Sequence, residues 1–232
     1  DFLMTYQAMQ KIKPDLIELL KMSDMVTVST QHLAEEMKAY NQNVMVVPNC
    51  VPVASRVTQQ SESRVKLLLA SSDSVRVDFV ISAIARVLET KELDVELICI
   101  GPPSQAIEHA SIPIAQVHPC MSYDSFKDFL SKSDNTIGLV PLDDSRFSRC
   151  KSAVKYLDYA SAGIPVICSN VAPYTDVVDD GVTGVLCEND TEAWVQAICE
   201  LVASSSKREQ IASSARSFAT ENRSLEKLKP YH

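Results

Sequence analysis

The chain has 232 residues, enough for one large domain with a hydrophobic core of its own. Hydrophobic residues make up 46% and charged residues 22%, which excludes a disordered or fibrous chain. The 22 basic residues are outnumbered by 30 acidic ones, and a net charge of −8 disfavours binding to nucleic acid. No stretch approaches the roughly 18 apolar residues of a membrane span, and the first ten residues lack the pattern of a signal peptide. We therefore predict a soluble, cytoplasmic protein.

Short apolar runs alternate with amphipathic stretches, the pattern that builds parallel sheets from strand-helix-strand units. Strands are predicted at 25–29, 44–47, 66–70, 95–100, 137–142, 166–169 and 185–187, and helices at 15–22, 31–40, 75–90, 123–132, 152–162, 191–203 and 207–221. The helix at 152–162 has recognisable ends, with Ser152 at its start and Gly163 and Pro165 after its end. We predict the α/β class, with a Rossmann-like parallel sheet and helices on both faces.

A polar segment with several prolines, between about 48 and 64, indicates a boundary between domains. The elements before it are too few to close a core of their own. We therefore expect residues 1–50 to be the remnant of an N-terminal domain. The rest divides into a linker at 51–64, a ligand-binding domain at 65–222 and a tail at 223–232.

The cysteines and other isolated residues have structural interpretations. The chain has seven cysteines, an odd number, and no Cys-x-x-Cys pair, which favours a reducing compartment and gives no support for a metal site. The apolar runs contain four of them, which we expect to fill the core: Cys99, Cys168, Cys187 and Cys199. Trp194 is expected in the core as well, and Asp180–Gly181 in a turn.

The most informative stretch joins the strand at 137–142 to the helix at 152–162. It carries four cations and no acid between them: Arg146, Arg149, Lys151 and Lys155. The loop lies at the carboxyl edge of a parallel sheet, where open α/β sheets bind ligands. Because the amino end of a helix is already positive, uncompensated cations there predict a bound phosphate or diphosphate. Asp158, one turn further on, could then hold a ribose hydroxyl. The alternative is a solvated basic turn in which Lys151 and Lys155 pair with Asp158.

Other loops at the same edge are weaker candidates. The serine-rich loop at 71–78 contains Arg76 and Ser72, which we include in the site, but no glycine, so it is not a dinucleotide fingerprint. The loops at 101–104 and at 170–174, the latter with Tyr174, are either walls of a nucleotide pocket or plain turns.

The stretch KSAVKYLDYASAGIPVICSNVAPYTDVVDDGVTGVLCENDTEAWVQAICELV, at 151–202, resembles the donor-binding half of GT-B glycosyltransferases of the retaining, family-four-like group. The similarity runs from about residue 22 to about residue 221. It implies that the chain is the C-terminal half of a GT-B fold, which binds a nucleoside diphosphate sugar without a metal. The sugar would pass, with retention, to a glycan or lipid-linked acceptor of bacterial surface polysaccharide. The acceptor would be held by the N-terminal domain, with peripheral association to the membrane.

The resemblance also implies roles for individual residues. Lys151 and Ser152 would face the diphosphate, and Lys155 would add charge. Asp158 would take the place of the second Glu of a Glu-x7-Glu pattern and hold the ribose, and Arg76 would match a basic residue of the first loop. We assign Lys151 and Arg76 to catalysis. The predicted donor-binding residues are Ser152, Lys155, Asp158, Arg149, Ser72 and Tyr174.

One departure concerns the first Glu of that pattern, whose place is taken by Cys150. Three other functions therefore stay open: a sugar-nucleotide-binding module without turnover, a GT-B epimerase, and a scaffold domain that has lost its ligand. The epimerase would need an acid or base that we do not find near the cations.

Overall fold

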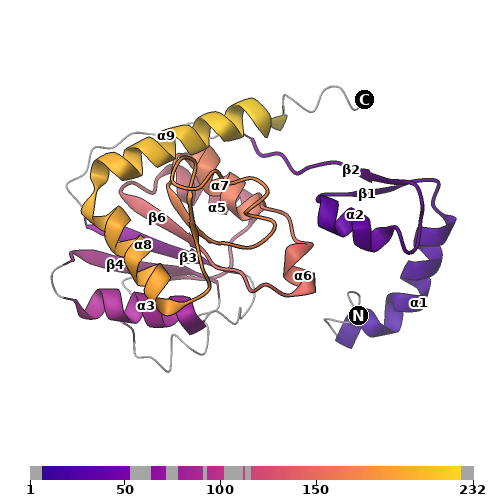
Figure 1. Cartoon of the computed structure of the whole chain (residues 1–232), viewed down its shortest axis with the longest axis horizontal. Helices are drawn as coiled ribbons and strands as arrows, with labels where there is room; N and C mark the ends of the chain where they lie inside the picture. The colour runs from indigo at the N-terminus through magenta and orange to yellow at the C-terminus, as the bar shows by residue number, and fades with distance from the viewer. Residues whose placement is uncertain are drawn as a thin grey trace.

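A computed structural model of the chain describes residues 7–52, 64–71, 78–90, 93–101, 112 and 116–225 (Figure 1). This part of the chain forms a two-stranded parallel sheet, β1-β2, and a six-stranded parallel sheet in the order β5-β4-β3-β6-β7-β8. The strands are β1 (Val26–Val28), β2 (Val44–Val46), β3 (Val65–Ala70), β4 (Val95–Ile100), β5 (Gln116–His118), β6 (Thr136–Val140), β7 (Val166–Ser169) and β8 (Val185–Cys187). The helices are α1 (Gln7–Met22), α2 (Gln31–Met37), α3 (Asp78–Glu89), α5 (Tyr123–Ser131), α6 (Arg146–Arg149), α7 (Val154–Ala162), α8 (Thr191–Ala203) and α9 (Ser205–Asn222).

The predicted α/β class and parallel sheet are confirmed, and the differences have local causes. β5 was missed because its three residues, QVH, lie at the sheet edge and are not buried. α6 was missed because it is a single turn, capped by Ser145. α1 begins earlier than predicted, at Gln7, so Pro14 lies inside it.

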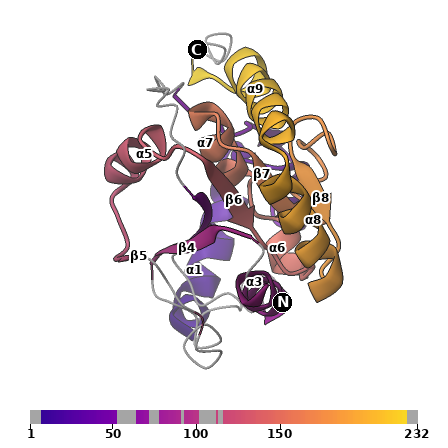
Figure 2. The same cartoon turned by 90° about the vertical axis from the view of Figure 1, so that its left-hand side faces the viewer.

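The strands of the large sheet are apolar along most of their length because helices cover both faces (Figure 2). In β3, Leu67 and Leu69 pack with α3 and α8 on one face, whereas Leu68 and Ala70 pack with α5 and α7 on the other. Trp194 of α8 is fully buried in the first of these cores, as predicted. Of the four cysteines expected in the core, Cys99, Cys168 and Cys187 are buried, and Cys199 is partly buried against it.

Helix α7 is fixed tightly on the sheet. Gly138 of β6 leaves room for the ring of Tyr159, because a Cβ at this glycine would lie 3.1 Å from that ring. The helix ends at Gly163, whose φ of 70° is the left-handed conformation of a helix C-cap. It begins at Val154, two residues later than predicted, so Ser152 is not its cap; the N-cap is Ala153, which provides no side-chain hydrogen bond.

The segment that leads from the small sheet to the large one lies beside the segment that follows α9. Val51 is buried in the core beside α7, and its backbone N–H donates to the carbonyl of Arg223 at 2.9 Å. Most of the predicted linker, at 53–63, and of the predicted tail, at 226–232, lies outside the described residues. Within the described ranges, every helix is too short or too polar to cross a lipid bilayer.

Candidate functional site

The strand order of the large sheet reverses between β3 and β6. From β3 the chain proceeds outward to β4 and β5, and from β6 it proceeds in the other direction to β7 and β8. The carboxyl ends of β3 and β6 therefore border the crevice where α/β sheets bind ligands. Helix α7 follows β6, and Nζ of Lys155 in its first turn donates to the carbonyl of Ala70, the last residue of β3, at 2.7 Å. The fold thus brings Lys155 to the switch point of the sheet.

Asp158 lies one turn further along α7 and is only 7% exposed. Its Oδ1 accepts a hydrogen bond from the hydroxyl of Tyr123 at 2.8 Å. Burial raises the pKa of Asp158 to about 6, against the opposing effects of the Tyr123 hydrogen bond and of the charges on Lys127 and Lys155. The alternative of an exposed ion pair is therefore wrong, since this carboxyl group is buried.

Tyr123 is a site residue that the sequence pattern did not indicate. It is the first residue of α5, after the N-cap Ser122, and Nζ of Lys127 lies 4.8 Å from the centre of its ring. The one sequence signal for Tyr123 was its position where a loop that follows a strand leads into a helix. Its contact with Asp158 could not be seen in the sequence, because the two residues are 35 positions apart.

The cation cluster differs from the expectation, because two of its members are neutralised by acids outside the stretch 146–155. Arg146 forms a bidentate ion pair with Glu36 of α2, in which Nε donates to Oε1 at 2.6 Å. Arg149 pairs with Asp144, with Nε to Oδ1 at 2.6 Å. These pairs lower the pKa of Glu36 and of Asp144. The predicted uncompensated positive charge is therefore wrong for both arginines, and the role of Arg149 in donor binding stays a prediction.

The other predicted residues have varied surroundings. Nζ of Lys151 lies 5.1 Å from the centre of the Phe147 ring. The hydroxyl of Ser152 accepts from Nδ2 of Asn49 at 3.1 Å. Tyr174 is 5% exposed and packs in the core beside α7, and its role in donor binding stays a prediction. The predicted residues Arg76 and Ser72 lie outside the described residues.

The loop before α7 also contacts the N-terminal part of the chain. Thr30 Oγ1 donates to the carbonyl of Cys150 at 3.3 Å, next to the contact between Asn49 and Ser152. The side chain of Cys150 is buried, and burial raises the pKa of its thiol. Helix α6, at the start of this loop, faces the small sheet (Figure 1). The loop is therefore held by both parts of the chain.

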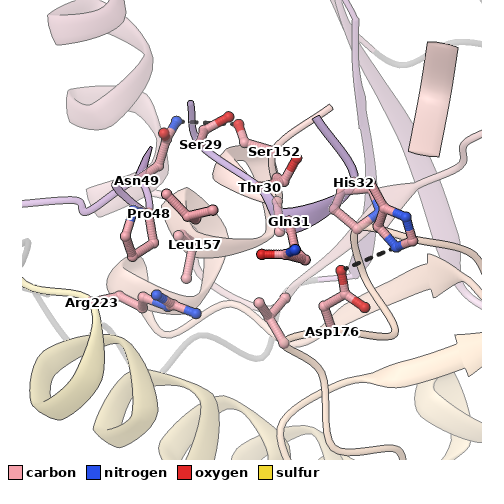
Figure 3. A pocket seen from close by; sticks show the side chains of 14 residues that line it. Ser29, Thr30, Gln31, His32, Pro48, Asn49, Ser152, Leu157, Asp176 and Arg223 are labelled. Carbon is pink, nitrogen blue, oxygen red and sulfur yellow. Dashed lines mark hydrogen bonds and ion pairs between the residues drawn. The ribbon is translucent and has the colours of Figure 1, made fainter. Parts of the chain in front are cut away.

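A cavity of about 370 Å³ lies between these parts (Figure 3). Its walls come from the ends of β1 and β2, from Ser152 and Leu157 at α7, from the segment 173–177 and from Arg223 after α9. His32 and Asp176 face each other across one side of it, with 3.8 Å between Nε2 and Oδ2. The described residues include no group of three or more His, Cys, Asp or Glu side chains arranged to hold a metal ion.

Residues 63–204 match the model of the family described as Glycosyl transferases group 1, which covers more than half of the chain. The chain therefore belongs to this family. No curated protein matches it in sequence.

Several solved structures have the same fold. TarM of S. aureus, in complex with UDP, is 16% identical with a TM-score of 0.72, covering 95% of this chain and 45% of TarM. Sucrose-phosphate synthase of Thermosynechococcus elongatus is 13% identical with a TM-score of 0.71, covering 97% of this chain and 60% of the synthase. HepE of Anabaena, in complex with UDP and glucose, is 14% identical with a TM-score of 0.76, covering 100% of this chain and 68% of HepE. The fold is thus that of the Rossmann-like C-terminal half of GT-B glycosyltransferases, and the chain spans about half of TarM.

Proposed function

We propose that this chain is the donor-binding domain of a retaining glycosyltransferase, which transfers a sugar from a nucleoside diphosphate sugar to a glycan or surface-polysaccharide acceptor. The observation that carries the proposal is the position of the Lys155 amine, fixed on the carbonyl of Ala70 at the switch point, with the buried Asp158 one turn further on. Family membership supports sugar transfer. The UDP in the TarM and HepE complexes supports a nucleotide donor.

The mechanism in this proposal is electrostatic. As the bond between the anomeric carbon and the diphosphate lengthens, negative charge builds on the departing diphosphate. Lys151, Lys155 and the N–H groups of the first turn of α7 stabilise that charge, and no metal ion is needed. The carboxylate of Asp158 accepts hydrogen bonds from the ribose hydroxyls, while the Tyr123 hydroxyl keeps it oriented.

A second candidate is a sugar-nucleotide-binding module without turnover. It is favoured by Cys150, a buried thiol where the family pattern has a carboxylate beside the donor sugar. Transfer or hydrolysis of a donor sugar by the protein distinguishes the two, because only the transferase breaks the bond to the diphosphate.

The test of donor binding is a thermal-shift panel with UDP, GDP, TDP and CMP. A ligand that binds the folded state raises stability by about 2.7 kcal/mol at a concentration of 100 Kd. We expect one nucleoside diphosphate to raise the Tm clearly more than the others. A panel in which none raises it contradicts the proposal.

Lys151→Ala is expected to weaken binding of that nucleoside diphosphate about tenfold, since hydrogen bonds to charged groups contribute about 1.5–3 kcal/mol. The Tm without ligand should stay nearly unchanged, because the amine of Lys151 lies over the Phe147 ring at the surface of the loop. Titration calorimetry measures the affinity. Arg146→Gln is the matched control, because Glu36 already holds this guanidinium, and it should leave the affinity within about twofold. Unchanged affinity in Lys151→Ala removes Lys151 from the site.

A further inference from the structure

The cavity of about 370 Å³ lies on a different side of α7 from the proposed donor site. Ala153 and Leu157, four positions apart and so on one face of the helix, line the cavity. Lys155, midway between them in sequence, points the other way, to the carbonyl of Ala70. The cavity is therefore separate from the diphosphate position, although Ser152 at the start of the helix lies beside both.

Arg223 brings a positive charge into this cavity and forms no ion pair with the described part of the chain. Figure 3 shows its side chain extending from the end of α9 toward the middle of the lining residues. Its Nε is buried without a hydrogen-bond partner among the described residues. None of the described carboxylates forms an ion pair with it, and the acid that lines the cavity, Asp176, lies opposite His32 instead. Arg223 is only partly buried, but its Nε is shielded from water and has no partner among the described residues. Such a guanidinium favours an anionic ligand, which it binds through two parallel hydrogen bonds.

The remaining lining suits a sugar. Gln31 and Asn49 offer side-chain amides and Ser29 offers a hydroxyl, while Pro48 and Leu157 offer apolar surface. Amide and hydroxyl groups bind sugar hydroxyls, and apolar side chains cover the faces of a sugar ring. The volume lies at the lower end of the range of roughly 300–1,000 Å³ for ligand pockets, which fits a monosaccharide unit.

We propose that this cavity binds an anionic sugar, a monosaccharide unit that carries a carboxylate or a phosphate, with Arg223 on the anionic group. Because the cavity lies beside Ser152 and between the two parts of the chain, the bound sugar is part of the acceptor. This acceptor role rests on the proposed function, whereas binding of the anionic sugar does not.

The experiment is titration calorimetry of the whole chain with glucuronate, glucose 6-phosphate and glucose. We expect glucuronate or glucose 6-phosphate to bind at least tenfold more tightly than glucose, and the preferred one identifies the anionic group as carboxylate or phosphate. Arg223→Gln should weaken this binding about tenfold or more, since it removes the charged partner. The affinity for the nucleoside diphosphate should stay unchanged, because the donor site is separate.

Arg64→Gln is the matched control, since it removes one exposed arginine beside the amino end of β3, paired with Asp94. Folding of Arg223→Gln is checked by its Tm; the backbone hydrogen bond from Val51 to residue 223 does not involve the side chain. Equal binding of glucose and the anionic sugars, or binding that survives Arg223→Gln, overturns the inference. Binding of an anionic sugar that depends on Arg223, in a chain that binds no nucleotide, supports the inference and contradicts the proposed function.

Discussion

At pH 8, Asp158→Asn is expected to be more stable than the wild-type chain, by up to about 3 kcal/mol. The pKa of Asp158 is raised by burial from 3.8 to about 6 in the folded state. A carboxyl group with a raised folded pKa favours folding when it is protonated. That contribution is fully present below pH 3.8 and is lost as the pH rises through 6. About two pKa units correspond to about 3 kcal/mol. An asparagine side chain carries no charge, so it avoids the cost of burying an ionised carboxylate. Its amide oxygen can still accept the hydrogen bond from Tyr123.

The measurement is urea unfolding of both proteins at several values between pH 4 and pH 8. The stability difference should be small at pH 4, grow between pH 4 and pH 6, and level off above. Asp124→Asn is the control, because this carboxylate on α5 is 92% exposed. Tyr123→Phe should act in the opposite direction, lowering stability more at pH 8 than at pH 4, since it removes a donor to the ionised group. A stability difference that does not vary with pH contradicts the argument.

The same substitution should weaken nucleotide binding. A carboxylate can accept hydrogen bonds from both ribose hydroxyls, whereas an amide has only one acceptor oxygen. A residue whose substitution makes the protein more stable is typically one that is kept for its function. An Asp158→Asn variant that is more stable and binds nucleotide as well as the wild type would assign this residue no part in the donor site.

Much of the fold could be predicted from the sequence because both faces of the large sheet are buried. Its central strands therefore consist of continuous runs of apolar residues. Strands β4, β7 and β8 lie at their predicted positions for this reason. Strand β5 could not be found this way, since its exposed residues carry no such run. The single turn of α6 is too short for a helical period.

The candidate site was predictable where its residues are close in sequence. Lys155 and Asp158 lie on one helix, and the order of strand and helix places that helix at the carboxyl edge. The pairing of Arg146 was not predictable, because its partner Glu36 lies 110 positions away, whereas Asp144, the partner of Arg149, lies only five positions before it. Tyr123 was not predictable either, because its hydrogen bond to Asp158 depends on how α5 packs against α7. Local sequence indicates which groups are present, and packing decides which of them keep a free charge.

Lys155→Met is expected to weaken binding of the nucleoside diphosphate by roughly tenfold to a hundredfold. The Lys155 amine lies 2.7 Å from the carbonyl of Ala70, at the switch point where the phosphates are proposed to bind. Hydrogen bonds to charged groups contribute about 1.5–3 kcal/mol, and methionine keeps the apolar stem while removing the charge. Titration calorimetry gives the affinity. Lys132→Met is the control, because this lysine, the C-cap of α5, pairs with Asp128 at the surface.

A second measurement separates loss of charge from loss of structure. The charge of Lys155 lowers the pKa of Asp158, so Lys155→Met should raise that pKa further above about 6. The measurement compares the stability of Lys155→Met with that of the double variant Lys155→Met, Asp158→Asn at each pH. The difference between the two should appear at higher pH than the corresponding difference between the wild type and Asp158→Asn. Lys155→Arg keeps the positive charge and should keep the pKa of Asp158 near its wild-type value. If Lys155→Met binds nucleotide normally while the pH profile shifts as expected, Lys155 acts on Asp158 alone and the diphosphate lies elsewhere.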